Sequence, residues 1–80
     1  EYIPSARVRE VVDQLPEVAG AGFVRREYFE KGLGMVHEGL VLDGRYLVHA
    51  SSEKGKVIRV DFLDYLKRQG YTGVSFYELK

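Results

Sequence analysis

The sequence predicts an α+β fold, an antiparallel sheet of about four to five strands with two short helices packed on one side. Stretches of β-type residues outnumber helical ones, and short turns separate most consecutive stretches, which suits antiparallel pairing. Asp43-Gly44, between two such stretches, is among the strongest hairpin signals. With 80 residues, 45% apolar and 30% charged, the chain has the size of one small domain, residues 1–80, with a thin core.

Two segments have helical patterns. The first is expected to start at Ser5, a favourable cap residue, and to end before Pro16, with apolar residues at helical spacing between them: Val8, Val11, Val12 and Leu15. The second begins after Asp61 and ends at Gly70, a common left-handed residue at a helix end. Its apolar face is expected to consist of Phe62, Tyr65 and Leu66.

The strands are expected where aromatic and β-branched residues gather. A small, glycine-rich stretch, Glu17 to Gly22, leads into the first strand, and a loop with Gly32 and Gly34 follows it. The polar turn from Ser52 to Gly55 precedes the fourth strand. In chain order the expected strands are Phe23 to Phe29, Met35 to Leu42, Arg45 to Ser51, Lys56 to Val60 and Gly73 to Leu79.

Composition excludes several classes of function. Twelve acidic residues balance twelve basic ones without a run of like charge, so neither a nucleic acid nor an anionic membrane is expected as a partner. No segment approaches the roughly 18 apolar residues of a membrane span, and Glu1 to Ser5 do not resemble a signal peptide, so an exported protein would already have lost its signal. The sequence has no cysteine, which excludes a disulfide, a thiolate zinc site and a catalytic thiol within it. No cofactor is expected.

The two histidines, His37 and His49, lie on the two arms of the expected hairpin. Histidine is the side chain best suited to proton transfer near neutral pH, so this pair is the first candidate for a site. Histidines on half-buried strands also serve packing or surface roles. The register of the hairpin therefore decides whether the two rings can cooperate.

Two registers are possible. A two-residue loop would pair Leu42 with Arg45 and put the histidines on opposite faces of the sheet. A three-residue loop would pair Val41 with Arg45 and place the histidines directly opposite each other, with Cβ atoms about 5 Å apart. The residue pattern alone permits both.

The hairpin segment, residues 37–52, reads HEGLVLDGRYLVHASS. It resembles the pattern of NlpC-type, papain-like cysteine peptidases, in which a His-x-Gly strand turns back into an apolar-His-Ala-Ser strand. Other segments resemble landmarks of one branch, the bacterial N-acetylmuramoyl-L-alanine amidase-like proteins: Tyr2-Ile3-Pro4-Ser5, Lys56-Val57, Asp64-Tyr65-Leu66 and Thr72-Gly73. The resemblance spans nearly the whole chain and implies the C-terminal part of a larger catalytic domain, the sheet half of a papain-like NlpC fold.

The resemblance implies roles for both histidines and favours the facing register. His37 would be the base for a cysteine nucleophile, and His49 would orient it, in hydrolysis of a cell-wall peptide or muropeptide. The family's cysteine precedes the Tyr-Ile-Pro segment, so this chain would be inactive alone. The implied partner is the missing Cys-bearing N-terminal segment, or a second copy through uncovered apolar sheet surface. The implied location is the cell envelope, periplasmic or secreted.

Residues around the histidines have weaker predictions. Gly39 is a candidate substrate-binding residue because it would leave a cleft floor open to substrate backbone, although a strand glycine equally marks a bulge. Glu38 points away from His37 by alternation. Ser51 and Ser52 fit turn entry and backbone hydrogen bonding better than nucleophilic attack.

Other side chains have two readings each. The pair Arg25-Arg26 either meets a substrate carboxylate or is solvated surface. The aromatic residues Tyr28, Tyr46 and Tyr77 either line a groove or pack in the core, and core packing is the commoner role.

Two further functions compete with the amidase reading. One is a non-catalytic module that binds a glycan, a peptide or a protein through a degenerate site. The other is metal binding by His37 and His49, which is a poor site because no carboxylate stands at a clear ligand spacing, so no metal is expected.

Overall fold

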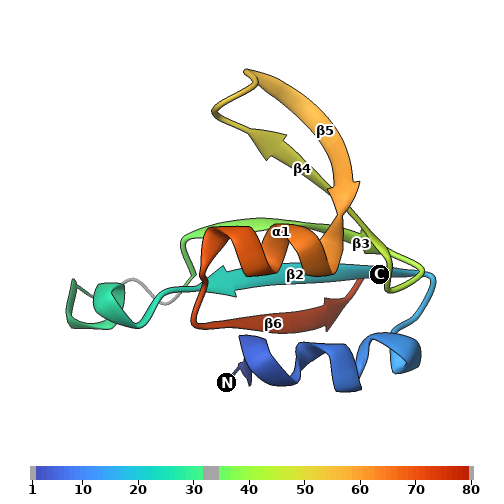
Figure 1. The fold of residues 1–80 in the computed structure, drawn as a ribbon, viewed down its shortest axis with the longest axis horizontal. Helices are drawn as coiled ribbons and strands as arrows, with labels where there is room; N and C mark the ends of the chain where they lie inside the picture. The colour runs from blue at the N-terminus through green and yellow to red at the C-terminus, as the bar shows by residue number, and fades with distance from the viewer. Residues whose placement is uncertain (1, 32–34, 80) are drawn as a thin grey trace.

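The computed structural model describes residues 2–31 and 35–79, and the strands in these ranges form one six-stranded sheet in the order β1-β6-β2-β3-β4-β5 (Figure 1). All neighbouring strands are antiparallel. One α-helix and three 3₁₀ helices accompany the sheet in the described residues. In chain order the elements are β1 Ile3–Pro4, η1 Ser5–Glu10, η2 Val12–Gln14, β2 Val18–Val24, η3 Arg26–Lys31, β3 His37–Leu42, β4 Tyr46–Ser51, β5 Lys56–Asp61, α1 Phe62–Gln69 and β6 Gly73–Glu78.

The predicted α+β arrangement of four to five strands with two short helices is wrong. The described residues form six strands and a single α-helix, and most of the structure is antiparallel sheet. The differences lie in the N-terminal third, where a predicted helix becomes 3₁₀ and the first long strand has a different position. The predicted loop at Gly32 and Gly34 lies outside the described residues.

The segment expected to be the first α-helix forms η1 and η2 instead. The Ser5 side chain caps no helix, because its Oγ donates to the carbonyl of Tyr71 at 2.6 Å. Its backbone N–H donates to the carbonyl of Thr72 at 3.0 Å. Val11, with a φ angle of −117°, lies between η1 and η2 and separates them. Tertiary hydrogen bonds thus fix the start of this segment, and its neighbouring β-branched residues give an α-helix little intrinsic support.

The central strand β2 occupies the stretch that was expected to be a glycine-rich connection, and η3 follows where the strand was expected. The alternating small residues of β2 allow close packing on both of its faces. Ala19 and Ala21 face the core, while Gly20 and Gly22 face the other way and are covered by Tyr77 and Met35, which leave no room for a Cβ. Small residues here serve packing rather than chain flexibility, and local propensity could not reveal this.

The short strand β1 was not anticipated. It pairs with β6, Ile3 opposite Val74 and Pro4 opposite Gly73, at one edge of the sheet. Proline lacks a backbone donor and is tolerated at such an edge.

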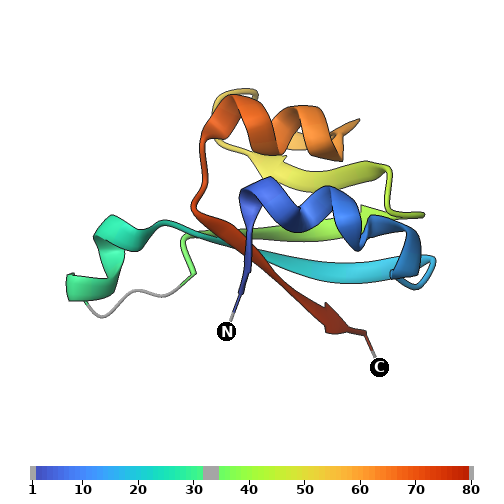
Figure 2. The same cartoon turned by 60° about the horizontal axis from the view of Figure 1, so that its bottom comes forward.

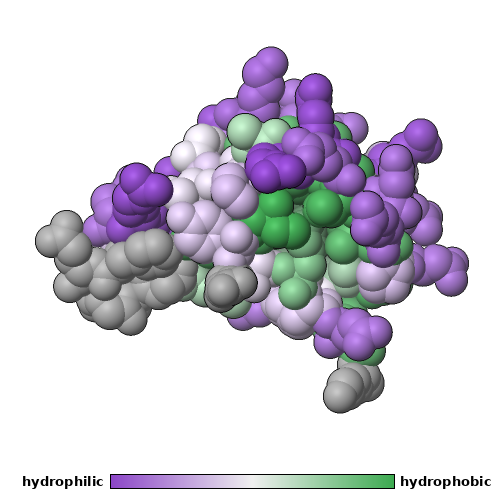
Figure 3. Space-filling model, turned by 90° about the horizontal axis from the view of Figure 1, so that it is seen from below, coloured by the Kyte–Doolittle hydropathy of each residue, from purple (hydrophilic) through white to green (hydrophobic). Residues whose placement is uncertain are grey.

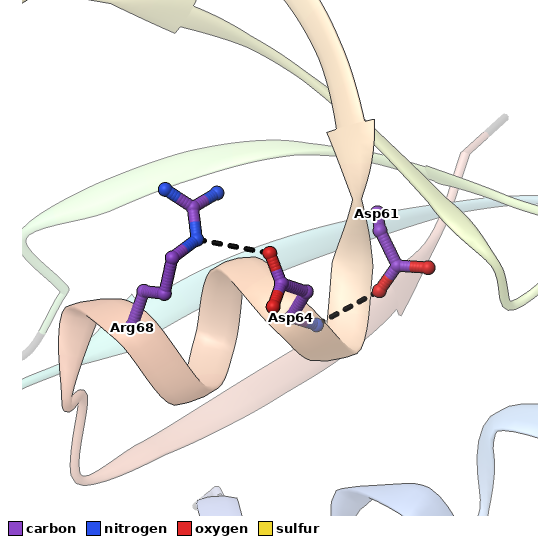
Figure 4. A network of polar contacts seen from close by, with 3 residues as sticks. All are labelled: Asp61, Asp64 and Arg68. Carbon is purple, nitrogen blue, oxygen red and sulfur yellow. Dashed lines mark hydrogen bonds and ion pairs between the residues drawn. The ribbon is translucent and has the colours of Figure 1, made fainter.

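Helix α1 begins and ends as the sequence predicts. The side chain of Asp61 accepts a hydrogen bond from the backbone N–H of Asp64 at 2.8 Å, and Arg68 Nε lies 2.9 Å from the Asp64 carboxylate (Figure 4). Gly70 closes the helix with a φ of 66°. No helix within the described ranges is both long and apolar enough to cross a membrane.

The helices η1 and α1 lie on the same face of the sheet (Figure 2). This covered face contains the hydrophobic core. The helices contribute Val8, Phe62, Tyr65 and Leu66, and the strands contribute Ala21, Phe23, Val41, Leu47 and Val74. Strand β4 shows the alternation clearly, since Leu47 and His49 are buried while Tyr46, the first residue of the strand, is exposed.

The opposite face of the sheet carries exposed apolar side chains. Strand pairing places Val18, Leu40 and Tyr77 on this face, and all three are exposed. Seen from below, from the side of η1 and β6, another apolar area is bordered by hydrophilic side chains (Figure 3). The core is therefore confined to one side of the sheet, as the thin core expected for this length implies.

Two glycines with similar backbone angles provide a matched stability test. Gly44 (φ 65°) and Gly55 (φ 69°) are both left-handed, but a Cβ at Gly44 would collide with the Val12 carbonyl, whereas nothing lies within 4 Å at Gly55. We expect Gly55→Ala to lower the free energy of unfolding by about 1 kcal/mol through backbone strain. Gly44→Ala should lower it by about 2–4 kcal/mol because overpacking adds to the strain. Denaturant unfolding measures both, and equal losses would contradict the steric role of Val12.

Candidate functional site

The β3–β4 hairpin has neither of the two registers predicted from the sequence. Leu42 pairs with Tyr46, which leaves residues 43–45 in the turn. Asp43 and Gly44 have φ angles of 53° and 65°, and the Arg45 N–H donates to the Leu42 carbonyl at 2.9 Å, the geometry of a type I′ turn followed by one extra residue. The contact of Gly44 with Val12 fixes this turn against η2.

This register still places both histidines on the covered face of the sheet. Leu40 pairs with Val48, so continuing the ladder puts His49 across from Gly39, with His37 two residues farther along β3 on the same face. His37 Nε2 and His49 Nδ1 lie 2.8 Å apart, and the two rings are perpendicular with centroids 5.0 Å apart. The predicted direct opposition is wrong, and a diagonal contact brings the rings together instead.

Gly39 makes this diagonal contact possible. A Cβ on Gly39 would lie 2.7 Å from the Val48 carbonyl oxygen and 3.0 Å from the His49 Cβ, closer than real side chains allow. Any other residue would push β3 and β4 apart or displace the His49 ring. The structure thus gives Gly39 a packing role, and its predicted contact with substrate stays a prediction.

His49 is the buried member of the pair, with 6% of its surface exposed. Burial lowers its pKa, and the neighbouring His37 lowers it further, so the neutral imidazole is favoured. Its Nδ1 contacts His37, while its Nε2 has no hydrogen-bond partner among the described residues. A neutral His49 whose Nδ1 accepts the Nε2–H of His37 leaves the Nδ1 lone pair of His37 for a proton.

Aromatic rings hold the pair in place. Phe23 stacks on His37 with centroids 5.9 Å apart, and on Tyr71 with centroids 4.8 Å apart. The Tyr65 ring lies 4.7 Å from that of His49, and its hydroxyl is 3.3 Å from the Tyr71 hydroxyl. Burial raises the pKa of Tyr65, and the hydrogen bond with Tyr71 raises it further, so Tyr65 stays protonated at neutral pH. The histidines therefore have an uncharged, rigid environment on their inner side.

Both histidines open onto a cleft of about 570 Å³, here called the histidine cleft. Its lining comes from the segment that follows β2, the start of β3, the strands β4 and β5 with the turn between them, helix α1 and the link that follows it. Besides the histidines, its polar and aromatic lining includes Arg25, Tyr28, Glu53, Lys54, Arg68 and Tyr71. The cleft offers room for an extended peptide or a short segment of another chain beside the imidazole pair.

Only some of the remaining predicted residues reach the histidine cleft. Glu38 lies on the face away from His37, as expected, and accepts a hydrogen bond from the Tyr77 hydroxyl at 2.9 Å. Ser51 and Ser52 line the cleft, but Ser51 Oγ accepts the backbone N–H of Lys54 at 3.1 Å, which confirms its predicted role in the turn. Of the three tyrosines considered from sequence, Tyr28 lines the cleft, whereas Tyr46 and Tyr77 do not.

Several residues of the cleft had no predicted role in a site, among them Tyr65, Arg68 and Tyr71. Tyr65 was expected only as part of the helix core, and helical spacing correctly placed it there. Its position beside His49 depends on how α1 crosses the sheet, for which the sequence offers no local signal. Within the described residues no group of three or more histidine or carboxylate side chains could hold a metal ion.

Comparison with protein families, with curated proteins and with solved structures found no match to this chain.

The lowered pKa of His49 predicts a pH dependence of stability. In the unfolded chain histidine binds a proton near its ordinary pKa of 6.5, whereas folded His49 resists protonation. The contribution of His49 to the free energy of unfolding is therefore fully present above about pH 6.5. It is lost as the pH falls from there toward the lower pKa that His49 has in the folded protein. We expect the unfolding free energy of the wild type to fall more between about pH 7.5 and 5 than that of His49→Asn, which keeps an acceptor near Nδ1 but does not titrate. Carboxylates affect both proteins alike, and parallel pH profiles would show that His49 is not linked to folding.

Proposed function

We propose that this chain supplies the base and the orienting histidine of a cysteine amidase or peptidase that hydrolyses bacterial cell-wall peptides, and that it is inactive without a cysteine from elsewhere. The observation that carries the proposal is the 2.8 Å contact between His37 Nε2 and His49 Nδ1 at the histidine cleft. A catalytic base oriented through its second ring nitrogen is the shared requirement of thiol and hydroxyl acyl transfer. Three parts of the proposal rest on the sequence resemblance: the cysteine nucleophile, the class of substrate and the location in the cell envelope.

The proposed chemistry uses Nδ1 of His37, which has no hydrogen bond to any of the described residues. His37 Nδ1 takes the thiol proton, and the thiolate attacks the amide carbonyl to form a tetrahedral intermediate. The imidazolium then gives this proton to the leaving amine, and an acyl thioester remains. Water attacks the thioester while His37 takes one of its protons, and the proton returns to the thiolate as the acid leaves.

His49 is the orienting group in this scheme. Its Nδ1 accepts the Nε2–H of His37, which fixes both the tautomer and the ring angle of the base. When His37 carries the proton, His49 stays neutral because burial and the neighbouring positive charge both lower its pKa. In this scheme His37, which lines the cleft, carries the transferred proton, and the buried ring of His49 acts as a hydrogen-bond acceptor.

The nucleophile has to come from a segment that contains cysteine, since this sequence has none. Among the serines of the cleft, Ser51 is already bonded within its turn. We propose that a Cys-bearing segment enters the histidine cleft beside His37. Association between copies through exposed apolar sheet residues is the other partner arrangement, but it brings no cysteine.

The activity test uses muropeptides and mass spectrometry. The 80-residue chain alone should release no product. The complete product of its gene should cleave an amide bond, and iodoacetamide should abolish this cleavage. His37→Ala should lower kcat by about 10²–10⁴-fold because general base catalysis is lost.

A paired substitution at His49 separates orientation from packing. His49→Asn retains an acceptor close to Nδ1, whereas His49→Leu removes it. We expect the leucine variant to lose more kcat than the asparagine variant, with little change of KM in either.

For the base itself, full activity in the His37→Ala variant would contradict the proposed role of His37.

The second candidate is a non-catalytic module that binds peptides or glycans through the same cleft. The open, cysteine-free cleft favours it as the alternative. Binding of muropeptides by the complete gene product without any cleavage would support this candidate over the amidase.

A further inference from the structure

The histidine cleft is cationic although the protein is neutral overall. The chain has twelve basic and twelve acidic residues, yet the described lining of the cleft contains Arg25, Lys54 and Arg68 and only one acid, Glu53. The charge of Arg68 is offset by Asp64 at 2.9 Å. A cleft whose lining carries an excess of one sign of charge attracts a ligand of the opposite sign. Glu53 offsets one of the two remaining cations, Arg25 and Lys54, so the lining keeps one net positive charge.

Arg25 is held in a defined position. It directly follows β2, whose last carbonyl, that of Val24, accepts the Thr72 N–H at 2.8 Å. Its Nη2 donates to the Gln69 carbonyl at the end of α1 at 3.0 Å. Its guanidinium carbon lies 4.4 Å from the centre of the Tyr71 ring, a cation–π contact. Two elements and one buried ring therefore fix this arginine.

Arg25 has no carboxylate partner among the described residues. The ion pairs in these ranges are Arg7 with Glu10 and Arg68 with Asp64. The single hydrogen bond of Arg25 leaves most of its five N–H donors available, and a guanidinium presents two of them in parallel to a carboxylate. Its neighbour Arg26 is not part of the cleft lining.

We propose that Arg25 is the anchor for a substrate carboxylate in the histidine cleft, so that the cleft selects peptides with a free carboxylate near the amide that reaches His37. The stack of Tyr71, Phe23 and His37 sets the distance between the anchor and the base, because each ring contacts the next. The proposal deepens the proposed function, on which the link to the scissile amide rests. The carboxylate comes either from the peptide C-terminus or from an acidic side chain.

The binding test uses the cysteine-free chain, which does not turn the ligand over. The probes are the stem tripeptide L-Ala-γ-D-Glu-L-Lys, its C-terminal amide and its form with the glutamate α-carboxylate amidated, titrated by calorimetry. Amidating the recognised carboxylate should weaken binding about 10–100-fold, the loss of a charge-assisted bidentate contact, and amidating the other should change it little. The amidated probe that loses affinity identifies which carboxylate Arg25 binds.

Protein variants provide the matched comparison. Arg25→Gln should weaken binding as much as the amidation does, and the two changes together should cost no more than either alone. Arg26→Gln should change binding less than twofold. Arg25→Lys keeps the charge but loses the two parallel N–H donors of the guanidinium, so this variant should bind at an intermediate strength. Equal binding of the acid and both amides by the wild type overturns the proposal without requiring any variant to fold, and so does no binding of any probe.

The two proposals fail separately. Arg25-dependent binding without cleavage by the complete gene product leaves the carboxylate anchor intact and removes the amidase function. Cleavage of acid and amide substrates at equal kcat/KM removes the anchor and leaves the amidase function.

Discussion

The site depends on one constraint, the turn that sets the register of the β3–β4 hairpin. Asp43 and Gly44 both take left-handed angles, and the missing side chain of Gly44 lets the turn pack against the Val12 carbonyl. With Leu42 opposite Tyr46, both histidines fall on the covered face of the sheet. A shift of one residue would send one histidine to the other face. The contact between η2 and the turn is thus the tertiary anchor of the imidazole pair.

The pair has an asymmetric environment that suits unequal roles. His49 is buried, kept neutral and bounded by Tyr65, while His37 contacts it through one nitrogen and opens onto the cleft. Burial disfavours charge on the inner ring, so the pKa of His49 is lowered and its neutral form is favoured. Among the described residues Nε2 of His49 has no hydrogen-bond partner, and a buried polar atom without one destabilises the folded protein. Such local costs are commonly retained where they serve a site.

The same one-sided packing that forms the core also forms the cleft. Helix α1 covers the sheet next to the histidines, and its C-terminal end holds Arg25 through the Gln69 carbonyl and the adjoining Tyr71. Phe23 belongs to the hydrophobic core and at the same time stacks on His37 and Tyr71. Core packing and site geometry are therefore coupled through this ring. A loss of core packing at Phe23 would loosen His37 and Tyr71 together, and with Tyr71 the ring that Arg25 contacts.

The sequence by itself determined the local features. It located helix α1 with its Asp61 cap and Gly70 end, the hairpin at Asp43-Gly44, and the histidines as the candidate pair, because caps, turns and residue types act over a few neighbouring positions. Only the tertiary structure decided the hairpin register, the 3₁₀ form of the N-terminal segment and the position of β2. These depend on contacts between distant residues: Gly44 with Val12, Ser5 with Tyr71, and Gly20 with Tyr77. Arg25 and Arg26 are alike in sequence, and only the packing of α1 and Tyr71 places one of them in the lining of the histidine cleft, because long-range contacts are not encoded in local periodicity.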